Sequence, residues 1–333
     1  MKVAYITKNW SRGGNLLPII KAMPNSVQTD VFYGKSDLET LWIPRKRKKA
    51  LKQYDVLHIN GTLYGGFMPN DFKNIVVTVH TLAKSEYEFD RWKYWKGVLA
   101  EQRTIKTNQH RNVEYLCVSP FIEWDLHRHY PETEYCSTAI PHALCDSQFR
   151  GADWLDKHDE SEINIVTSGR LIKRKNFGDF LKIAKEYDHQ RNYKFHIIGD
   201  GVERGKLEKQ AGKNVIFYGD LREDIYQSFL QNSVTCYVST SLYEGDPQNI
   251  VDMMTIGVPV LAYPIPSMKD MIFDGATGYC FCTAKEFGEK LTELLTTSDM
   301  YQFIVENARE EVSHRPTAEQ IAKQFLEVYE ELV

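Results

Sequence analysis

The sequence has no long apolar run and almost no surplus of charge of one sign. No stretch of its 333 residues approaches the length of about 18 apolar residues that a membrane-spanning helix needs. The net charge of −4 provides no general attraction to nucleic acid or to anionic membranes. A membrane-spanning protein and a nucleic-acid-binding protein are therefore disfavoured, and no nucleic-acid partner is expected.

Cysteine is present, but its spacing does not indicate a disulfide framework or a zinc site. The six cysteines are scattered, and Cys280-Phe281-Cys282 has one spacer residue where zinc-binding pairs have two or more. Free thiols in a reducing compartment explain them better. Because residues 1–7 already have the composition of a strand, we expect no signal peptide and a cytoplasmic protein.

The length favours two domains of about 150 residues each. Short β-branched runs alternate with helical patterns through the chain, which predicts α/β architecture with parallel sheets. A charged segment, residues 153–162 (DWLDKHDESE), has the composition of a linker. We therefore predict a first domain over 1–152, a second over 153–314, and a separate C-terminal helical segment over 315–333.

The most informative stretch is 239–263, STSLYEGDPQNIVDMMTIGVPVLAY. An apolar run precedes it at 234–238, and a second begins at Val260, with a helical pattern between them. This order predicts a βαβ crossover, whose first loop lies at the carboxyl edge of a parallel sheet. That loop carries Glu244 beside Gly245, and Asp252 follows eight positions later.

The chemistry of this loop suits a nucleotide sugar. Backbone N–H groups of Gln248, Asn249 and Ile250 are expected to be unpaired donors at the helix start, which suits phosphate. Carboxylates such as Glu244 and Asp252 accept hydrogen bonds from sugar and ribose hydroxyls. For isolated acidic residues, a solvated loop and a helix-dipole contact are simpler explanations.

A second charged loop follows the predicted strand 163–168. It reads Gly-Arg-Leu-Ile-Lys-Arg-Lys-Asn over 169–176. Fixed cations stabilise the charge that develops on a departing diphosphate, although the same composition also suits an exposed loop. We expect Lys173 and Arg174 to face solvent.

Both stretches resemble the GT4-type family of retaining glycosyltransferases, which have the GT-B fold. That family carries S-x-x-E-G-F-P-x-x-x-x-E-A-M-x-x-G-x-P-V, and this chain reads S-L-Y-E-G-D-P-Q-N-I-V-D-M-M-T-I-G-V-P-V. Asp246 replaces the aromatic residue, and Asp252 replaces the second glutamate. The loop at 169–176 is similar to the family's G-R-L-x-x-x-K-N/G. The match covers about 163–281 closely, and the first 150 residues in outline.

The resemblance implies an α/β, GT-B protein with two Rossmann-like, doubly wound domains facing across a cleft. The segment 315–333 would pack back on the first domain. It also implies site residues in the second domain. Glu244 would hold the donor sugar, Arg170 and Lys175 the diphosphate, and Asp252 the ribose. The other donor-binding candidates in this domain are Gly199, Gly245, Gln248, Asn249 and Ile250.

Three candidate residues come from the first domain. His80 ends the predicted strand 75–80, where open α/β sheets place their ligand sites. The family has a histidine here that faces the donor sugar, although a lone histidine is often structural. Gly13-Gly14 follows the first strand, where the family places a glycine loop, although a tight turn explains the pair equally well.

Two further segments carry unusual composition. Arg45–Lys49 is a run of five cations, which suits a phosphorylated acceptor or peripheral contact with an anionic membrane, and equally a solvated helix face. Residues 87–96 interleave aromatic and cationic residues. This pattern fits stacking on a sugar acceptor, which we favour, contact with a membrane interface, or one buried helix face.

We therefore predict a retaining, metal-independent hexosyltransferase. It would move a hexose from a nucleotide diphosphate sugar, with UDP favoured, to a hydroxyl of a glycan or lipid-linked acceptor. The nucleotide sugar is a substrate, so no cofactor is expected. The alternatives are a related nucleotide-sugar epimerase or phosphorylase, and a catalytically degenerate nucleotide-binding subunit.

Overall fold

The computed structural model describes residues 1–8, 16–144 and 162–333. The chain divides into two compact units. Unit 1 comprises Met1–Cys145 and Pro316–Val333, and unit 2 comprises Asp146–Arg315. No described helix is long and apolar enough to cross a membrane.

Unit 1 is built on a six-stranded parallel sheet with the order β2-β1-β3-β4-β5-β6. Its strands are β1 (Lys2–Lys8), β2 (Gln28–Gly34), β3 (Val56–Asn60), β4 (Asn74–Val79), β5 (Asn112–Cys117) and β6 (Ser137–Ala139). Strands β1, β3 and β4 are almost entirely buried, as apolar strands covered on both faces should be. The strand order reverses between β1 and β3, which makes that point a topological switch.

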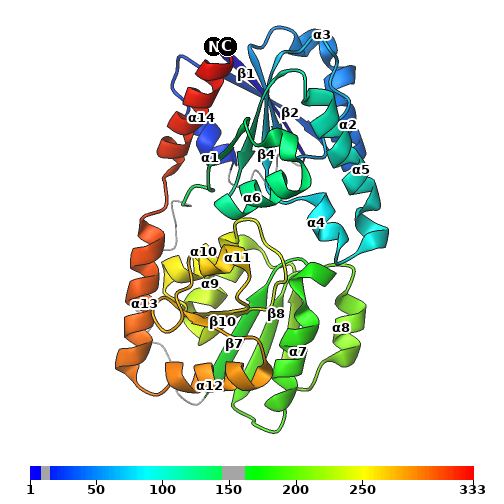
Figure 1. Cartoon of the computed structure of the whole chain (residues 1–333). Coiled ribbons are helices and arrows are strands. Elements are labelled where there is room, and N and C mark those ends of the chain that lie inside the picture. Colours follow the sequence, from blue (N-terminus) through cyan, green and yellow to red (C-terminus); the bar gives the residue numbers. More distant parts are fainter. Residues whose placement is uncertain (9–15, 145–161) are drawn as a thin grey trace. The chain divides into compact units, whose positions relative to one another are not determined.

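Helices cover both faces of this sheet (Figure 1). They are α1 (Leu16–Lys21), α2 (Asp37–Lys46), α3 (Lys48–Leu51), α4 (Ala83–Tyr87), α5 (Arg91–Asn108), α6 (Pro120–His129) and α14 (Ala318–Leu332). Helix α6 begins with the Ser119 side chain accepting from Ile122 N–H and with Pro120 in its first turn. Helix α14 begins with a capping box at Thr317 and Gln320.

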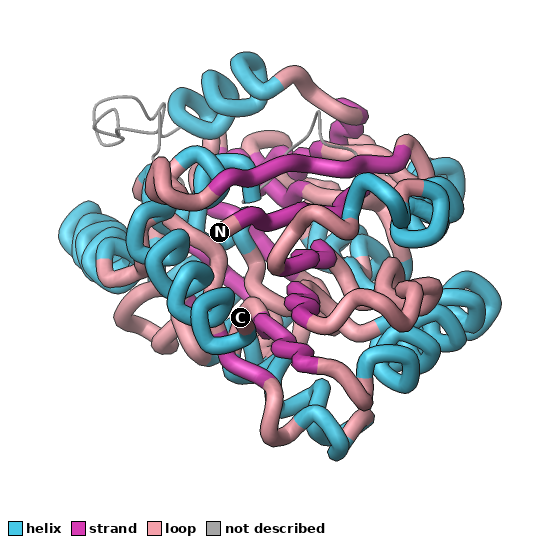
Figure 2. Tube along the Cα trace, turned by 90° about the horizontal axis from the view of Figure 1, so that it is seen from above, coloured by secondary structure: helices cyan, strands magenta, loops and turns pink. Residues whose placement is uncertain are grey.

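Helix α14 packs on the unit 1 sheet although it lies at the far end of the sequence. Its Phe325 and Tyr329 share a buried cluster with Val3 and Tyr5 of β1. The Tyr329 hydroxyl lies 2.9 Å from that of Tyr5 and 2.5 Å from Nδ1 of the buried His58. The two chain ends lie close together in consequence (Figures 1 and 2).

Unit 2 repeats the architecture, with the strand order β12-β11-β10-β7-β8-β9, again all parallel. Its strands are β7 (Ile163–Ser168), β8 (Tyr193–Ile198), β9 (Val215–Gly219), β10 (Cys236–Ser239), β11 (Val260–Ala262) and β12 (Tyr279–Cys280). The order reverses between β7 and β10. The loops that follow these two strands are therefore neighbours at the switch point, where open α/β sheets bind ligands.

The helices of unit 2 surround its sheet. They are α7 (Phe177–Glu186), α8 (Arg204–Gln210), α9 (Glu223–Ser233), α10 (Gln248–Ile256), α11 (Pro266–Lys269), α12 (Ala284–Leu294) and α13 (Ser298–Ser313). One core cluster joins α7, α12 and α13 to the sheet through Phe180, Phe287 and Ile304. The predicted α/β class with two parallel sheets is confirmed.

Candidate functional site

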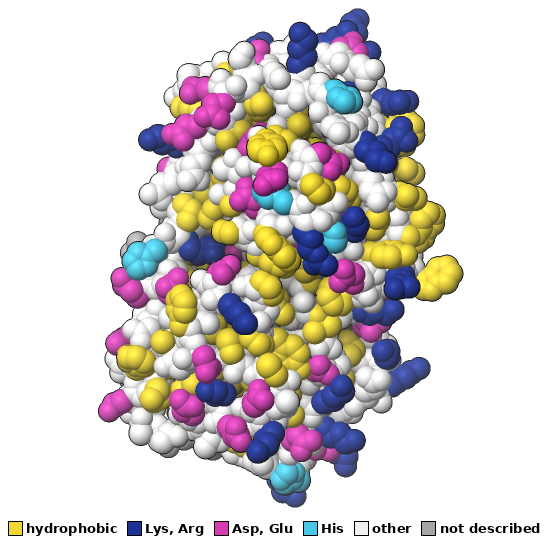
Figure 3. All heavy atoms as spheres, in the orientation of Figure 1, with side chains coloured by type: hydrophobic (Ala, Val, Ile, Leu, Met, Phe, Trp, Pro, Cys, Tyr) yellow, Lys and Arg dark blue, Asp and Glu magenta, His cyan; other side chains and the backbone are white. Residues whose placement is uncertain are grey.

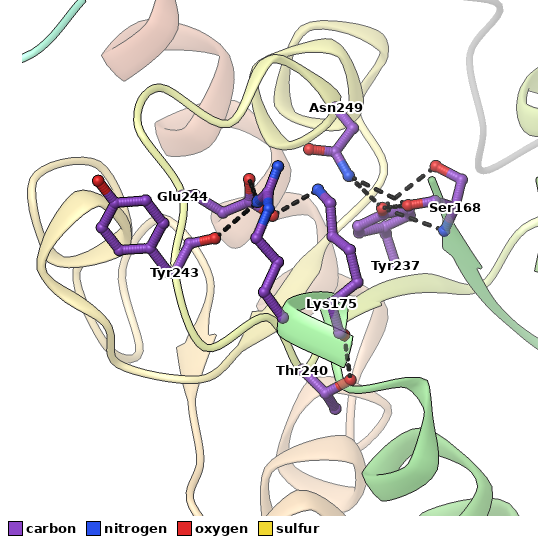
Figure 4. A network of polar contacts seen from close by, with 8 residues as sticks. Ser168, Lys175, Tyr237, Thr240, Tyr243, Glu244 and Asn249 are labelled. Atoms are coloured by element: carbon purple, nitrogen blue, oxygen red, sulfur yellow. Dashed lines mark hydrogen bonds and ion pairs between the residues drawn. The ribbon is translucent and has the colours of Figure 1, made fainter. Parts of the chain in front are cut away.

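The candidate site of unit 2 lies where β7 and β10 end, and one tyrosine holds this edge together. The Tyr237 hydroxyl of β10 donates to the Ser168 carbonyl at 3.1 Å and accepts from Ser168 N–H at 3.2 Å. It also accepts from Asn249 Nδ2 of α10 at 2.5 Å. Figure 4 shows these three residues converging. Asn249 thus joins the start of α10 to the end of β7. No pattern in the sequence pointed to Tyr237.

Two glycines shape the loop that follows β7. Gly169 and Gly199 have φ of +136° and +123°, which only glycine adopts easily. A Cβ on Gly199 would lie 2.1 Å from the Gly169 carbonyl oxygen. Gly199, predicted to bind the donor, therefore has a clear packing function, because it lets the β8 loop approach the loop of Arg170.

The cationic loop continues as a single 3-10 turn, η4 (Lys173–Lys175), and is joined to the loop after β10. Asn176 ends the turn in the left-handed conformation, with φ of 51°. The Thr240 hydroxyl donates to the Asn176 carbonyl at 2.9 Å. Leu242 N–H donates to the Arg174 carbonyl at 2.8 Å. These bonds hold the two loops side by side.

Glu244 lies between two cations from that loop. Arg174 Nη1 is 3.0 Å from Glu244 Oε2 and also donates to the Tyr243 carbonyl at 2.8 Å. Lys175 Nζ pairs with Glu244 Oε1 (Figure 4). Arg174 and Glu244 are buried and Lys175 is nearly so. The prediction that Arg174 faces solvent is wrong, because burying Glu244 demands compensating charge; Lys173 is exposed as expected.

The cationic partners of Glu244 favour the ionised form of its carboxyl group. Burial opposes ionisation of Glu244, but the charges of Lys175 and Arg174 outweigh it and lower the pKa of the carboxyl group. Burial lowers the pKa of Lys175, and the charges of Arg174 and Arg170 act in the same direction against Glu244. Two cations share one carboxylate, so the cluster has a surplus positive charge. Exposed Arg170 adds to it, which suits a phosphate-containing ligand.

The start of α10 lies next to this cluster, and no side chain caps it. Ile250 N–H donates to the Pro247 carbonyl at 2.9 Å, so the prediction of an unpaired donor there is wrong. Among the described residues, no acceptor is recorded for the backbone N–H groups of Gln248 and Asn249. Those two remain candidate phosphate ligands.

The other predicted residues of this loop occupy different environments. Gly245 is buried beside Glu244, and Asp252 is half-buried in the middle of α10. Asp246, which replaces the family's aromatic residue, is ion-paired with Arg315 at 2.5 Å and accepts from Gln248 Nε2 at 2.9 Å. Arg315 lies 69 positions from Asp246 in the chain, so the sequence held no signal for this pair.

In unit 1, His80 lies at the carboxyl edge of the sheet as predicted. Its Nε2 is 2.7 Å from Asn60 Oδ1, at the end of β3, and its Nδ1 is 3.1 Å from His142 Nε2. Because an amide oxygen only accepts, the neutral ring carries its proton on Nε2. Asn60 in turn donates to the Thr7 hydroxyl at 3.1 Å. His80 thus belongs to a polar network at the β1/β3 switch point.

The remaining predictions concern other segments. Gly13 and Gly14 lie outside the described residues. The cationic run Arg45–Lys49 spans the end of α2 and the start of α3, and Lys48 pairs with Asp71 at 2.8 Å.

Trp92 and Trp95 are exposed on α5, so the interpretation of residues 87–96 as one buried face is wrong. In the described part of the chain, no group of three or more His, Cys, Asp or Glu could hold a metal ion.

Comparison with known families identifies the second unit. Residues 154–311 match the family Glycosyl transferases group 1. Residues 154–311 thus match the family that the sequence resembles, and this resemblance is confirmed. The GT-B fold is also confirmed, since the similar solved structures are GT-B glycosyltransferases.

Two curated relatives and one structure illustrate the similarity. An uncharacterized 41.2 kDa protein in the cps region of Klebsiella pneumoniae is 25% identical over 317 residues, 88% of this chain and 84% of that protein. The Vi polysaccharide biosynthesis protein VipC/TviE of Salmonella typhi is 25% identical over 178 residues, 49% of this chain but 29% of that protein. HepE of Anabaena, crystallised with UDP and glucose, matches with a TM-score of 0.75 at 16% identity over 100% of both chains.

Proposed function

We propose that this protein is a retaining, metal-independent glycosyltransferase that uses a UDP-hexose donor. The observation that carries the proposal is the buried Glu244 with Arg174 and Lys175, at the switch point of a group 1 domain. A buried carboxylate with two cations and free backbone donors nearby provides the acceptors that sugar hydroxyls need and the charge that a diphosphate needs.

The sugar and the nucleotide diphosphate of the donor would bind to different residues. Glu244 accepts hydrogen bonds from hydroxyls of the donor sugar, and Asp252 from the ribose. Lys175, Arg170 and the N–H groups at the start of α10 hold the diphosphate. As the glycosidic bond breaks, negative charge grows on the departing diphosphate, and these fixed positive groups stabilise it without a metal ion. Attack on the same face of the sugar would retain its anomeric configuration.

The donor base and the acceptor class rest on the relatives. The HepE structure contains UDP, which favours a uridine nucleotide here. The Salmonella typhi relative is named for polysaccharide biosynthesis, which favours a hydroxyl of a glycan as acceptor. His80 of unit 1, whose ring is held by Asn60 and His142, stays a proposed catalytic residue.

Calorimetric binding of UDP, GDP, ADP and dTDP, with and without chelator, tests the donor site. We expect UDP to bind most tightly and its affinity to survive chelation. Lys175→Ala should weaken UDP binding by about tenfold, since it removes one charge-assisted contact. Lys173→Ala is the matched control, because Lys173 is exposed on the same turn and should bind UDP like the wild type.

Turnover distinguishes the proposed activity from its alternatives. A transferase releases UDP only when an acceptor is present, and proton NMR of the product should show the donor's anomeric configuration. Turnover of the donor alone to a second nucleotide sugar would indicate an epimerase. Binding of UDP without release from any donor would indicate a degenerate subunit, and either result would overturn the proposal.

A further inference from the structure

Helix α5 presents a row of exposed apolar side chains. Trp92, Trp95 and Leu99 have 90%, 45% and 55% of their surfaces exposed. Their spacing of three and four residues puts them on one side of the helix. The buried residues of α5 are Glu101, Thr104, Ile105 and Asn108, which contribute the packing that holds the helix. We call the side with Trp92, Trp95, Lys96, Leu99 and Arg103 the α5 outer face.

The charges of this helix are almost all positive. Its cations are Arg91, Lys93, Lys96, Arg103 and Lys106, and its one acidic residue, Glu101, is buried on the opposite side. Lys96 Nζ lies 5.3 Å from the ring centroid of Trp95. In Figure 3, hydrophobic and cationic side chains stand beside one another along the right edge of unit 1. Because the whole chain has a net charge of −4, this positive charge is local.

We propose that the α5 outer face binds the surface of an anionic lipid bilayer. Tryptophan rings with exposed bodies settle at the level of lipid headgroups, and Leu99, one turn after Trp95, adds apolar contact. The flanking cations complement anionic headgroups within a Debye length of the surface. A single exposed tryptophan is common on a protein surface and does not indicate a binding site. Two exposed tryptophans and an exposed leucine on one cationic side of a helix do indicate one.

The same criteria count against the other cationic segment of unit 1. In Arg45–Lys49, Lys48 is paired with Asp71, and the Arg45 guanidinium lies 5.7 Å from the ring centroid of Trp42. Its charges are therefore partly engaged within the protein. Arg103 of the α5 outer face is engaged as well, since it donates to the Gly66 carbonyl at 2.8 Å and stacks on the ring of Phe67. The two segments differ in the exposure of their aromatic rings, because Trp92 and Trp95 are exposed whereas Trp42 is half-buried. This difference places lipid contact at the α5 outer face and not at Arg45–Lys49.

Co-sedimentation of the full-length protein with vesicles tests this inference. The vesicles contain phosphatidylcholine alone or phosphatidylcholine with phosphatidylglycerol. We expect the wild type to bind the anionic vesicles at least tenfold more tightly than the neutral ones. Trp92→Ser with Trp95→Ser, and separately Lys93→Glu with Lys96→Glu, should each weaken anionic binding at least tenfold.

Matched controls distinguish binding through the α5 outer face from binding through any exposed aromatic ring or any exposed cation. Tyr135→Ser removes another aromatic side chain of unit 1, which is 95% exposed, and Lys206→Glu with Lys285→Glu reverses two exposed cations of unit 2. Both controls should bind vesicles like the wild type. Unchanged thermal unfolding and UDP affinity would show that the α5 variants remain folded.

Several results of the vesicle experiments would overturn the inference. They are failure of the wild type to bind anionic vesicles, wild-type binding by both α5 variants, and loss of binding only when Arg45–Lys49 is changed. Displacement of the protein from vesicles by a soluble glycan would also overturn it, since the face would then be a sugar site. The test needs no turnover, so it stands or fails independently of the proposed transferase activity.

Discussion

Two buried glutamates, one in each unit, show how neighbouring groups determine the pKa of the same kind of side chain. Glu244 of unit 2 has two cationic partners, and the pKa of its carboxyl group is lowered. Glu101 of unit 1 accepts hydrogen bonds from the hydroxyls of Thr62 and Tyr130 and from the N–H groups of Ala83 and Lys84. None of those donors is a charged group, and burial raises the pKa of Glu101 to about 7.

The difference separates a structural carboxylate from a candidate functional one. Glu101 of α5 joins the start of α4, three residues after His80, to Tyr130, which follows α6, through hydrogen bonds from neutral groups. Glu244 keeps its charge beside a surplus of positive charge, at the edge of a sheet where ligands bind. Depth of burial alone does not distinguish them, because both are buried.

The largest expected effect is that of Glu244→Gln. The substitution leaves Arg174 and Lys175 buried without their anion, which should cost about 3–5 kcal/mol of unfolding free energy. Sugar transfer should fall by a factor on the order of 100 or more, because the amide cannot replace a charged acceptor. Denaturant unfolding and an initial-rate assay measure the two losses. Wild-type stability would show that the charge cluster does not form.

The second largest effect is expected in the pH dependence of stability, to which Glu101 and Glu244 contribute with opposite signs. The pKa of Glu101 rises from an ordinary 4.5 to about 7 on folding, so its unfolded form ionises first as the pH increases. Its contribution is therefore fully present below about pH 4.5 and is lost by about pH 7, a change of about 3 kcal/mol. Glu244 acts in the opposite direction, since a lowered pKa contributes stability that is lost as the pH falls.

Denaturant unfolding of the wild type and of Glu101→Gln between pH 4.5 and 7 checks this sign. The variant cannot ionise at this position, so its stability should fall less than that of the wild type as the pH rises. Parallel curves for the two proteins would mean that Glu101 is already ionised at low pH in the fold.

A smaller effect is expected for Arg174→Lys. The charge toward Glu244 is kept, but the bond from the guanidinium to the Tyr243 carbonyl is lost, which should cost about 1–2 kcal/mol. Lys173→Arg, on the exposed side of the same turn, should be neutral. If both substitutions leave the unfolding midpoint unchanged, the planar geometry of Arg174 has no structural importance.

The smallest effect is expected for Asp252→Asn. Asp252 is half-buried in α10, so water partly replaces whatever its carboxylate binds. We expect a decrease in UDP affinity of about threefold, with unfolding unchanged within about 0.5 kcal/mol. Titration calorimetry measures the affinity. A loss of UDP affinity as large as that of Lys175→Ala would show that Asp252 contributes much more to donor binding than its exposure indicates.

Local features of the fold and the site were predictable from the sequence. Strand, charged loop and helix follow one another along the chain, so β7 with its Gly169 loop, and β10 with α10, were found by pattern. The positions of Glu244 and Lys175 at a sheet edge followed from the strands that precede them. The resemblance added the roles that residue patterns alone left open.

The partners of these residues were not predictable, because they depend on which strands become neighbours. Lys175 and Glu244 are 69 positions apart in the sequence, and they meet only because β7 and β10 pair. Arg174 was placed in solvent for this reason. Tyr237 gave no signal either, since a tyrosine in an apolar strand is usually a core residue.

The sequence by itself determined the α/β class, the two parallel sheets and the charged loops, because these depend on short-range periodicity and turn chemistry. The tertiary structure alone decided which charges are paired. It also decided which side of α5 faces solvent, because periodicity reveals a stripe and not what covers it. Burial and partner choice are properties of packing, and packing joins residues that the sequence keeps far apart.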